Sequence, residues 1–281
     1  MNYSEYIVMG TGILKFKIAL LLKSKDIPAT VWEYNLASSV KESCALNGIG
    51  YQFLRREEIY GRLKQLRPGA LIISAVNTYL FPADIVGAHT IINYHNSLLP
   101  RHPGMNAEAW QIYGMDDYAG VTWHYVDVNI DAGAIICQEK IPLDHRITSL
   151  KLLKRQSALA YSCFEGFADD LLSGGLRATG QENHHNRRWH YIKDVPNNGL
   201  LDLTWTAPRA SAFLRAMDYG AINTLGLPAV MVDDKTYSCK SYQITESSQN
   251  AETCLQDNRL YIENTGLKII VSLLDSQRNI S

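Results

Sequence analysis

The sequence lacks the cysteine pairs that metal and redox sites use, and it lacks a long apolar run. The chain has cysteines at positions 44, 137, 163, 239 and 254, an odd number without a C-x-x-C pair. We therefore expect reduced thiols, no bound metal and a cytoplasmic location. No apolar run approaches the roughly 18 residues that span a membrane, and the first residues do not read as a secretion signal. We expect no contact with a membrane.

The sequence also lacks an excess of either positive or negative charge. The 27 lysines and arginines nearly cancel the 28 aspartates and glutamates, which leaves a formal net charge of −1. Such a balance supplies no overall field that would steer the protein onto nucleic acid or an anionic membrane. What is abundant is apolar residues, at 46%, which is typical of a globular protein with a full-sized core. A length of 281 residues allows about two domains.

Short apolar strands alternate with helical segments in the first part of the chain. We expect strands over 6–9, 29–33, 51–53, 71–75 and 89–94, with helices between them over 13–24, 40–46 and 57–66. This alternation predicts an α/β fold with a Rossmann-like, mostly parallel sheet. Ligands of such sheets bind outside the carboxyl ends of the strands.

The second part of the chain has a different pattern. A pair of strands over 121–126 and 134–141 precedes a long helix that Gly174 and Gly175 end. A helix over 207–217 and two hairpins from the strands 228–232, 236–243, 259–263 and 268–273 predict a small C-terminal β-rich module. We therefore expect a domain over 1–180, a linker over 181–200 and the β module over 201–281.

A glycine turn joins the first strand to the first helix. Gly10, Thr11 and Gly12 allow a phosphate to approach backbone N–H groups at a helix N-terminus, and Glu33 stands where a ribose-binding acid would in a dinucleotide fold. Lys15 occupies the place of the third glycine of G-x-G-x-x-G, which argues against nicotinamide binding. A tight turn without a ligand is the alternative.

Asn93 and His95 stand two residues apart at the end of an apolar strand, so their side chains project from the same face. Asp131 follows in a loop between two later strands. An amide, an imidazole and a carboxylate at one edge of a sheet are a set that acyl transfer can use. Each residue alone has a simpler interpretation, as a cap or a local hydrogen-bonding group.

Together these blocks resemble the formyltransferases that use 10-formyltetrahydrofolate, a family that includes glycinamide ribonucleotide, methionyl-tRNA and amino-sugar enzymes. The resemblance covers residues 4–175 and rests on Asn93, His95, Ser97, Leu98, Leu99, Pro100, Gly104, Trp110, Gly120, Val121, Thr122, His124, Asp131, Gly133 and Gln138. It implies a formyltransferase fold for the domain over 1–180.

The resemblance also implies roles for single residues. Asn93 and a protonated His95 would face the oxygen that becomes negative when an amine attacks the formyl carbon, and Asp131 would favour the charged imidazole and accept the amine proton. The folate would lie against two loops, and the amine substrate against other positions. The folate residues are Asn77, Tyr79, Leu80, Phe81, Asp127, Val128, Asn129 and Ile130, and the substrate residues are Gly10, Thr11, Gly12, Ser97 and Trp110.

Two histidine features have simpler interpretations. We expect His124, a common family position, to be structural or to lie behind the catalytic residues. The run from His184 to His190 fits no usual zinc spacing, so we expect a solvated linker there, with contact between Arg188 or Lys193 and an acceptor phosphate as the alternative.

The acceptor amine is less well defined than the reaction. Residues 201–281 resemble the extension of the methionyl-tRNA and amino-sugar branches, yet they carry seven basic residues against nine acidic ones, which disfavours tRNA. We therefore expect a small biosynthetic amine, first a nucleotide-linked amino sugar and second an amino-acid-derived amine. A methionyl-tRNA formyltransferase, a formyltetrahydrofolate hydrolase and an NAD(P)-dependent oxidoreductase are the alternatives. A homodimer is left open.

Overall fold

The computed structural model describes residues 3–34, 38, 40–181 and 188–275. By their packing these residues form two compact units. The first unit comprises Met1–Gly104, Gly120–Lys140 and Arg155–Arg188, and the second comprises Met105–Ala119, Ile141–Lys154 and Trp189–Ser281. Both units are therefore built from several stretches of the chain, and each is described by itself below.

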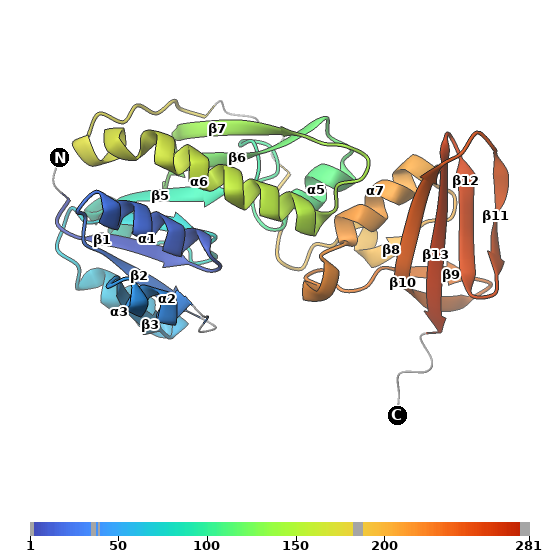
Figure 1. Cartoon of the computed structure of the whole chain (residues 1–281), viewed down its shortest axis with the longest axis horizontal. Coiled ribbons are helices and arrows are strands. Elements are labelled where there is room, and N and C mark those ends of the chain that lie inside the picture. The colour runs from blue at the N-terminus through green and yellow to red at the C-terminus, as the bar shows by residue number, and fades with distance from the viewer. Residues whose placement is uncertain (1–2, 35–37, 39, 182–187, 276–281) are drawn as a thin grey trace. The chain divides into compact units, whose positions relative to one another are not determined.

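The first unit is built on a sheet with the strand order β3-β2-β1-β4-β5-β6-β7 (Figure 1). The strands β1 to β5 pair in parallel, and β6 runs antiparallel to β5. The strands are β1 (Tyr6–Gly10), β2 (Ala29–Tyr34), β3 (Gly50–Leu54), β4 (Leu71–Ala75), β5 (Thr90–His95), β6 (Tyr118–Tyr125) and β7 (Ile135–Pro142). Every residue of β4 is buried, as expected of a parallel strand with both faces covered.

Helices cover both faces of this sheet. One face packs against apolar residues of α1 (Leu14–Ser24), α2 (Val40–Leu46) and the long helix α6 (Ser149–Ser173). The opposite face packs against α3 (Ile59–Lys64) and α4 (Ala83–Ala88). The expected Rossmann-like, mostly parallel sheet is confirmed, and its covered faces leave the strand ends as the place for a site.

The second unit contains a sheet with the order β11-β12-β13-β10-β9-β8. Its strands are β8 (Leu200–Leu201), β9 (Ala229–Val232), β10 (Lys235–Glu246), β11 (Ala251–Gln256), β12 (Arg259–Asn264) and β13 (Leu267–Asp275). The helix α7 (Ala207–Met217) shares a buried apolar cluster with this sheet, in which Phe213 and Leu214 meet Ile262 and Val271. The expected C-terminal β-rich module is confirmed.

The short helix α5 (Ala107–Tyr113) also belongs to the second unit. The Arg209 guanidinium of α7 lies over the Tyr113 ring at 3.7 Å from its centre. The Tyr219 hydroxyl donates to Oε1 of Glu108 at 2.5 Å, and both side chains are buried. Residues that are about a hundred positions apart in the sequence therefore form one core.

Several elements differ from the expectation, and one of them is α4, which lies outside every predicted helix. The edge strand β11 was not predicted, because its residues are mostly exposed and carry no apolar face. The helix α5 was missed because its polar residues Glu108 and Gln111 are buried with its apolar ones, so no exposed polar face marks a helical period. Part of the expected linker is ordered, since Pro196–Gly199 forms a 3-10 turn and Leu200 begins β8, while residues 182–187 lie outside the described part. Among the described helices, none combines the length and apolarity that a membrane crossing needs.

Candidate active site

Three polar side chains lie in a row across neighbouring strands of the first unit. The strand register pairs Ser74 of β4 with Asn93 of β5, and Asn93 with His124 of β6. Paired residues of adjacent strands point to the same face of a sheet, so these side chains meet. Their contacts follow from this register.

The hydrogen bonds along the row fix the orientation of the Asn93 amide. The Ser74 hydroxyl donates to Oδ1 of Asn93 at 2.7 Å, and Nδ2 of Asn93 lies 3.2 Å from Nε2 of His124. The Asn77 amide in turn donates to the Ser74 hydroxyl at 2.9 Å. Because an amide nitrogen carries two hydrogens, Asn93 keeps one for a further acceptor.

His124 is a neutral acceptor in this row. Its Nδ1 lies 2.8 Å from the carbonyl oxygen of Tyr125, which can only accept, so Nδ1 carries the proton and Nε2 accepts from Asn93. Burial lowers the pKa of His124 to about 4, although nearby Asp131 opposes this shift. His124 is only 2% exposed. It therefore lies behind Asn93, as the sequence predicts.

Asp131 lies between two imidazoles. Its Oδ2 is 3.7 Å from Nδ1 of His95, and its Oδ1 is 3.8 Å from Nε2 of His124. The backbone N–H of Gly104 donates to Oδ2 at 2.9 Å. Asn93, His95 and Asp131 are thus brought together, and the Asp131 carboxylate faces the His95 imidazole.

His95 is buried, and its Nε2 is already hydrogen-bonded. Nε2 lies 2.9 Å from the carbonyl oxygen of His102, to which it donates, and Nδ1 faces Asp131. Donation from His95 to a substrate oxygen requires that the His102 carbonyl give up this hydrogen bond. Catalytic hydrogen bonds often form only in the complex with substrate.

Several residues that the sequence did not single out support this arrangement. Ser74 orients Asn93, and the Gln181 amide donates to the carbonyl oxygens of Asp131 and Gly133 at 3.0 and 2.8 Å. The position of Ser74 at the end of a buried strand was a usable signal. Gln181 offered none, because it lies in a stretch without periodicity and reaches the site from 50 residues away.

Ser97 has a similar supporting place. The sequence assigns it to the amine substrate, but its side chain is fully buried. Its hydroxyl donates to the carbonyl oxygen of Arg101 at 2.6 Å, and so it holds the loop that leads to His102. Contact between Ser97 and the substrate stays a prediction.

The two loops expected to hold the folate extend from this part of the sheet. One follows β4 and contains Asn77, Tyr79, Leu80 and Phe81, and the other follows β6 and contains Asp127, Val128, Asn129 and Ile130. Tyr79, Phe81 and Val126 pack on the same apolar cluster, which anchors both loops. Leu80, Val128 and Ile130 expose 61%, 64% and 47% of their surface. Apolar side chains are thus presented to solvent on both loops.

The first glycine turn is explained by packing. A Cβ on Gly10 would lie 1.8 Å from the carbonyl oxygen of Ala75, so β1 and β4 approach too closely for any other residue. Gly12 has a φ of +69° with open space around it. The Thr11 N–H and hydroxyl each lie 3.0 Å from the carbonyl oxygen of Val76. The proposed contact between this turn and the amine substrate stays a prediction.

Lys15 and Glu33 form a buried ion pair next to this turn. Nζ of Lys15 lies 2.8 Å from Oε1 of Glu33, and both side chains are almost fully buried. Burial opposes ionisation of Glu33, but hydrogen bonds from Lys15, Ser38 and Tyr51 outweigh it and lower the pKa of Glu33 to about 2. The carboxylate that was a candidate for a ribose is therefore already occupied by three protein donors.

Trp110 belongs to the second unit. Its ring stacks on His190 with the centroids 4.2 Å apart and the planes 8° from parallel. His190 is 4% exposed, so the expectation of a solvated histidine run fails at this residue, because the indole covers its ring. The expected run from His184 to Arg187 lies outside the described residues. Within the described ranges, no cluster of His, Cys, Asp and Glu is arranged to hold a metal.

Two known formyltransferases are similar to this chain in sequence. GDP-perosamine N-formyltransferase of Brucella melitensis biotype 1 is 32% identical over 159 residues, which are 56% of this chain and 58% of that protein. Methionyl-tRNA formyltransferase of Lachnospira eligens is 24% identical over 207 residues, 72% of this chain and 64% of that protein. The matched regions thus span less than two thirds of both relatives.

A solved structure resembles the whole chain. It is an N-formyltransferase from Helicobacter canadensis, solved in complex with folinic acid and dTDP-3-aminofucose, with a TM-score of 0.76 and 17% identity. The likeness covers 98% of this chain and 100% of that one. The family model described as Formyl transferase matches residues 9–165, more than half of the sequence. The chain therefore belongs to the formyl transferase family.

Proposed function

We propose that the protein transfers a formyl group from 10-formyltetrahydrofolate to the primary amine of a nucleotide-linked amino sugar. The observation that carries this proposal is the meeting of Asn93, His95 and Asp131 at one end of the sheet, with the Asn93 amide oriented as a donor. This is the set of groups that transfer of an acyl group to an amine needs.

The two loops after β4 and β6 fit a folate. The flat pterin ring needs apolar surface and backbone hydrogen-bonding groups, and Leu80, Val128 and Ile130 offer exposed apolar side chains on these loops. Asn77 joins the first loop to the catalytic row through Ser74. The bound donor would supply the formyl carbon that the amine attacks, and tetrahydrofolate would leave when the bond from its N10 to that carbon breaks.

Each residue of the site would have its own role in the transfer. The second amide hydrogen of Asn93 donates to the formyl oxygen as that oxygen gains negative charge, and His95 donates to the same oxygen when it is protonated. Removing one such donor typically costs about 3 kcal/mol of transition-state stabilisation. Asp131 favours the protonated His95 and accepts the proton that the amine loses, directly or through water.

A nucleotide-linked amino sugar is the acceptor that the relatives favour. The Brucella relative is named for GDP-perosamine, and the Helicobacter structure holds dTDP-3-aminofucose. A methionyl-tRNA relative also matches, but residues 201–281 carry more acidic than basic residues, which disfavours tight binding of tRNA phosphates. An amino-acid-derived amine is the second choice. A cytoplasmic location and a homodimer stay predictions.

The surroundings of the glycine turn over 10–12 do not support an oxidoreductase. Glu33, which would bind a nicotinamide ribose, accepts hydrogen bonds from Lys15, Ser38 and Tyr51. The Lys15 side chain lies where close packing of helix and strand would require glycine. Binding of NAD(P)H would contradict this interpretation.

The proposal is tested by screening amines with 10-formyltetrahydrofolate as donor. Release of tetrahydrofolate should depend on a nucleotide amino sugar, whose mass should rise by one formyl group. Tetrahydrofolate and formate released without any amine would identify a hydrolase instead. Turnover with methionyl-tRNA and none with nucleotide amino sugars would overturn the choice of acceptor.

A further inference from the structure

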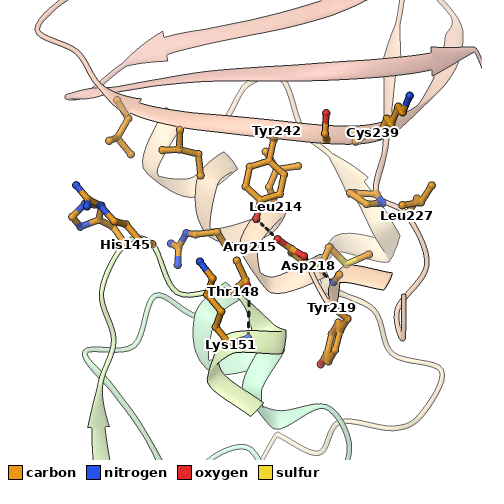
Figure 2. A pocket seen from close by; sticks show the side chains of 18 of the residues that line it. His145, Thr148, Lys151, Leu214, Arg215, Asp218, Tyr219, Leu227, Cys239 and Tyr242 are labelled. Carbon is orange, nitrogen blue, oxygen red and sulfur yellow. Dashed lines mark hydrogen bonds between the residues drawn. The ribbon is translucent and has the colours of Figure 1, made fainter. Parts of the chain in front are cut away.

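The second unit contains a pocket that the proposed reaction does not use. Its volume is about 840 Å³, which lies in the range of small-molecule sites. Its wall is formed by the segment that leads into α6, by the end of α7 and by β10, and Figure 2 shows Arg215 and Tyr242 directed into it. None of the predicted catalytic or folate residues lines this pocket.

Arg215 is a buried cation in this wall. It is 8% exposed, and its Nε and one terminal nitrogen donate to the Ser211 hydroxyl and to the carbonyl oxygen of Ile147, both at 3.1 Å. Burial lowers the pKa of Arg215, and the charge of nearby Asp144 only partly opposes this shift. A buried guanidinium without a direct ion pair is costly, and an anion in the pocket would relieve that cost.

Further positive charges surround Arg215. Arg146, Lys151 and Lys240 line the pocket with exposed side chains, and none of them pairs with a described carboxylate. The two acidic lining residues are Asp218 and Glu246. Asp218 is already engaged, because it accepts from the Tyr242 hydroxyl at 2.7 Å and from the Gly220 N–H at 2.9 Å. The pocket as a whole thus carries an excess of positive charge.

Much of the rest of the lining is apolar, although polar side chains and Lys240, which follows Cys239, also belong to it. Figure 2 shows His145 and Arg215 on one side of the pocket, and Leu227 and Cys239 on the other. Leu214 and Tyr242 lie between them. A ligand that matched this distribution would be anionic at one end and less polar at the other.

The N-terminus of α6 is not the source of the positive charge of the pocket. The N–H of Leu150 donates to the Asp218 carbonyl oxygen at 3.1 Å, and the N–H of Lys151 lies 3.5 Å from the Thr148 hydroxyl. Two N–H groups of the first turn therefore already have partners within the protein. What remains for a ligand is the set of basic side chains.

We propose that this pocket is a second binding site, which takes a small organic anion. A phosphate or carboxylate group would contact Arg215, Arg146 and Lys151, and a less polar body would lie against Leu227 and Cys239. The site is independent of the proposed formyl transfer, because its residues and its ligand are different. A failure of one proposal leaves the other standing.

The test is calorimetric titration of the full-length protein without folate donor or amine. The probes are inorganic pyrophosphate, citrate, thymidine diphosphate and uncharged thymidine. We expect saturable binding of at least one anion, no binding of thymidine, and weaker binding as the salt concentration rises. A phosphate preference would show as pyrophosphate or thymidine diphosphate binding more tightly than citrate.

Variants locate the site. We expect Lys151→Gln and Arg146→Gln each to weaken binding about tenfold, since each removes one charge-assisted contact. Lys154→Gln is the matched control, because Lys154 lies one turn along the same helix and does not line the pocket. Arg215→Gln should abolish binding, and the two exposed variants keep the test valid if this buried variant does not fold.

Hydrogen exchange then separates this pocket from the acceptor site. We expect a bound anion to protect peptides over 145–151 and 239–246. The proposal is wrong if no anion binds at millimolar concentration. It is equally wrong if binding is unchanged in Lys151→Gln and Arg146→Gln, because the anion then binds elsewhere.

Discussion

The side-chain amide of Asn93 donates a 3.2 Å hydrogen bond to Nε2 of His124, its register partner on the neighbouring strand. Since Ser74 donates to the amide oxygen from the other side, the amide cannot turn over without placing its oxygen against the lone pair of His124. The row therefore determines which end of Asn93 faces a reacting oxygen.

Removing the Ser74 hydroxyl should loosen this orientation. We expect Ser74→Ala to lower kcat about tenfold with little change in KM, because orientation of the donor matters most in the transition state. Steady-state kinetics with the amine substrate checks this. Ser162→Ala, at an exposed position on α6, is the control. An unchanged kcat in folded Ser74→Ala would show that Asn93 needs no support from β4.

The carboxylate of Asp131 should be required for the chemical step. We expect Asp131→Asn to lower kcat by at least about a hundredfold, because the amide neither stabilises a protonated His95 nor accepts the amine proton. Folding should persist, since the amide oxygen can still accept from Gly104. Glu139→Gln changes an exposed carboxylate on β7 and should leave kcat unchanged. Near-normal turnover of Asp131→Asn would remove this residue from the mechanism.

Burial of neutral His124 should make stability depend on pH. Its pKa is about 4 when folded, below the 6.5 of an unperturbed histidine, so the unfolded chain binds more protons between these pH values. Stability should therefore fall as the pH drops from 6.5 towards 4, by about 3 kcal/mol from this group. Urea unfolding at several pH values measures this fall in the free energy of unfolding.

A non-titrating variant isolates this contribution. The difference in unfolding free energy between the wild type and His124→Gln should shrink as the pH drops from 6.5 towards 4. His145→Gln, at an exposed histidine, should leave the wild-type profile unchanged. Parallel profiles for the wild type and His124→Gln would mean that His124 is not held neutral.

The buried pair of Lys15 and Glu33 should be sensitive to removal of one partner. We expect Lys15→Met to lower the free energy of unfolding by about 3–5 kcal/mol at pH 7, because it leaves a buried carboxylate without its cation. Adding Glu33→Gln should recover part of this loss. Lys17→Met, at an exposed lysine of the same helix, should change stability by about 0.5 kcal/mol or less. Equal effects of Lys15→Met and Lys17→Met would contradict the pairing.

The two glycines of the first turn should respond differently to alanine. Gly10→Ala places a Cβ against the Ala75 carbonyl oxygen, and we expect it to prevent folding or to cost more than about 3 kcal/mol. Gly12→Ala meets no atom within 4 Å and should cost only about 1 kcal/mol for its positive φ. Thermal unfolding compares the two. Similar melting temperatures would show that the turn adjusts to a side chain.

The parallel sheet was predictable because its signals are local and repeated. Apolar strands such as 71–75 and the helix over 40–46 were predicted with the bounds that the structure has. The edge strand β11 was not, because half-exposed edge strands need no apolar face. The pairing of sequence-distant strands, such as β10 with β13, was not predictable from local patterns either.

The candidate site was predictable where residue types follow each other along a strand. Asn93 and His95 could be placed on one face from their spacing, and Asp131 was grouped with them from its place in a loop between two later strands. The resemblance to the family then supported all three. The role of Ser74 depends on the register between β4 and β5, which the sequence does not contain. The hydrogen bond of His95 to the His102 carbonyl depends on the path of a loop, and no periodicity describes such a path.

The ties between Glu108 and Tyr219 and between Ser149 and Ala216 limit where the chain could be cut or recombined. A chimera that exchanged only residues 201–281 with a relative would leave α5 and the start of α6 facing a foreign helix. A viable exchange would have to carry the segments 105–119 and 141–154 as well. These segments lie inside the stretch that matches the family model. An exchange of the C-terminal module therefore has to include parts of the stretch that matches the family model.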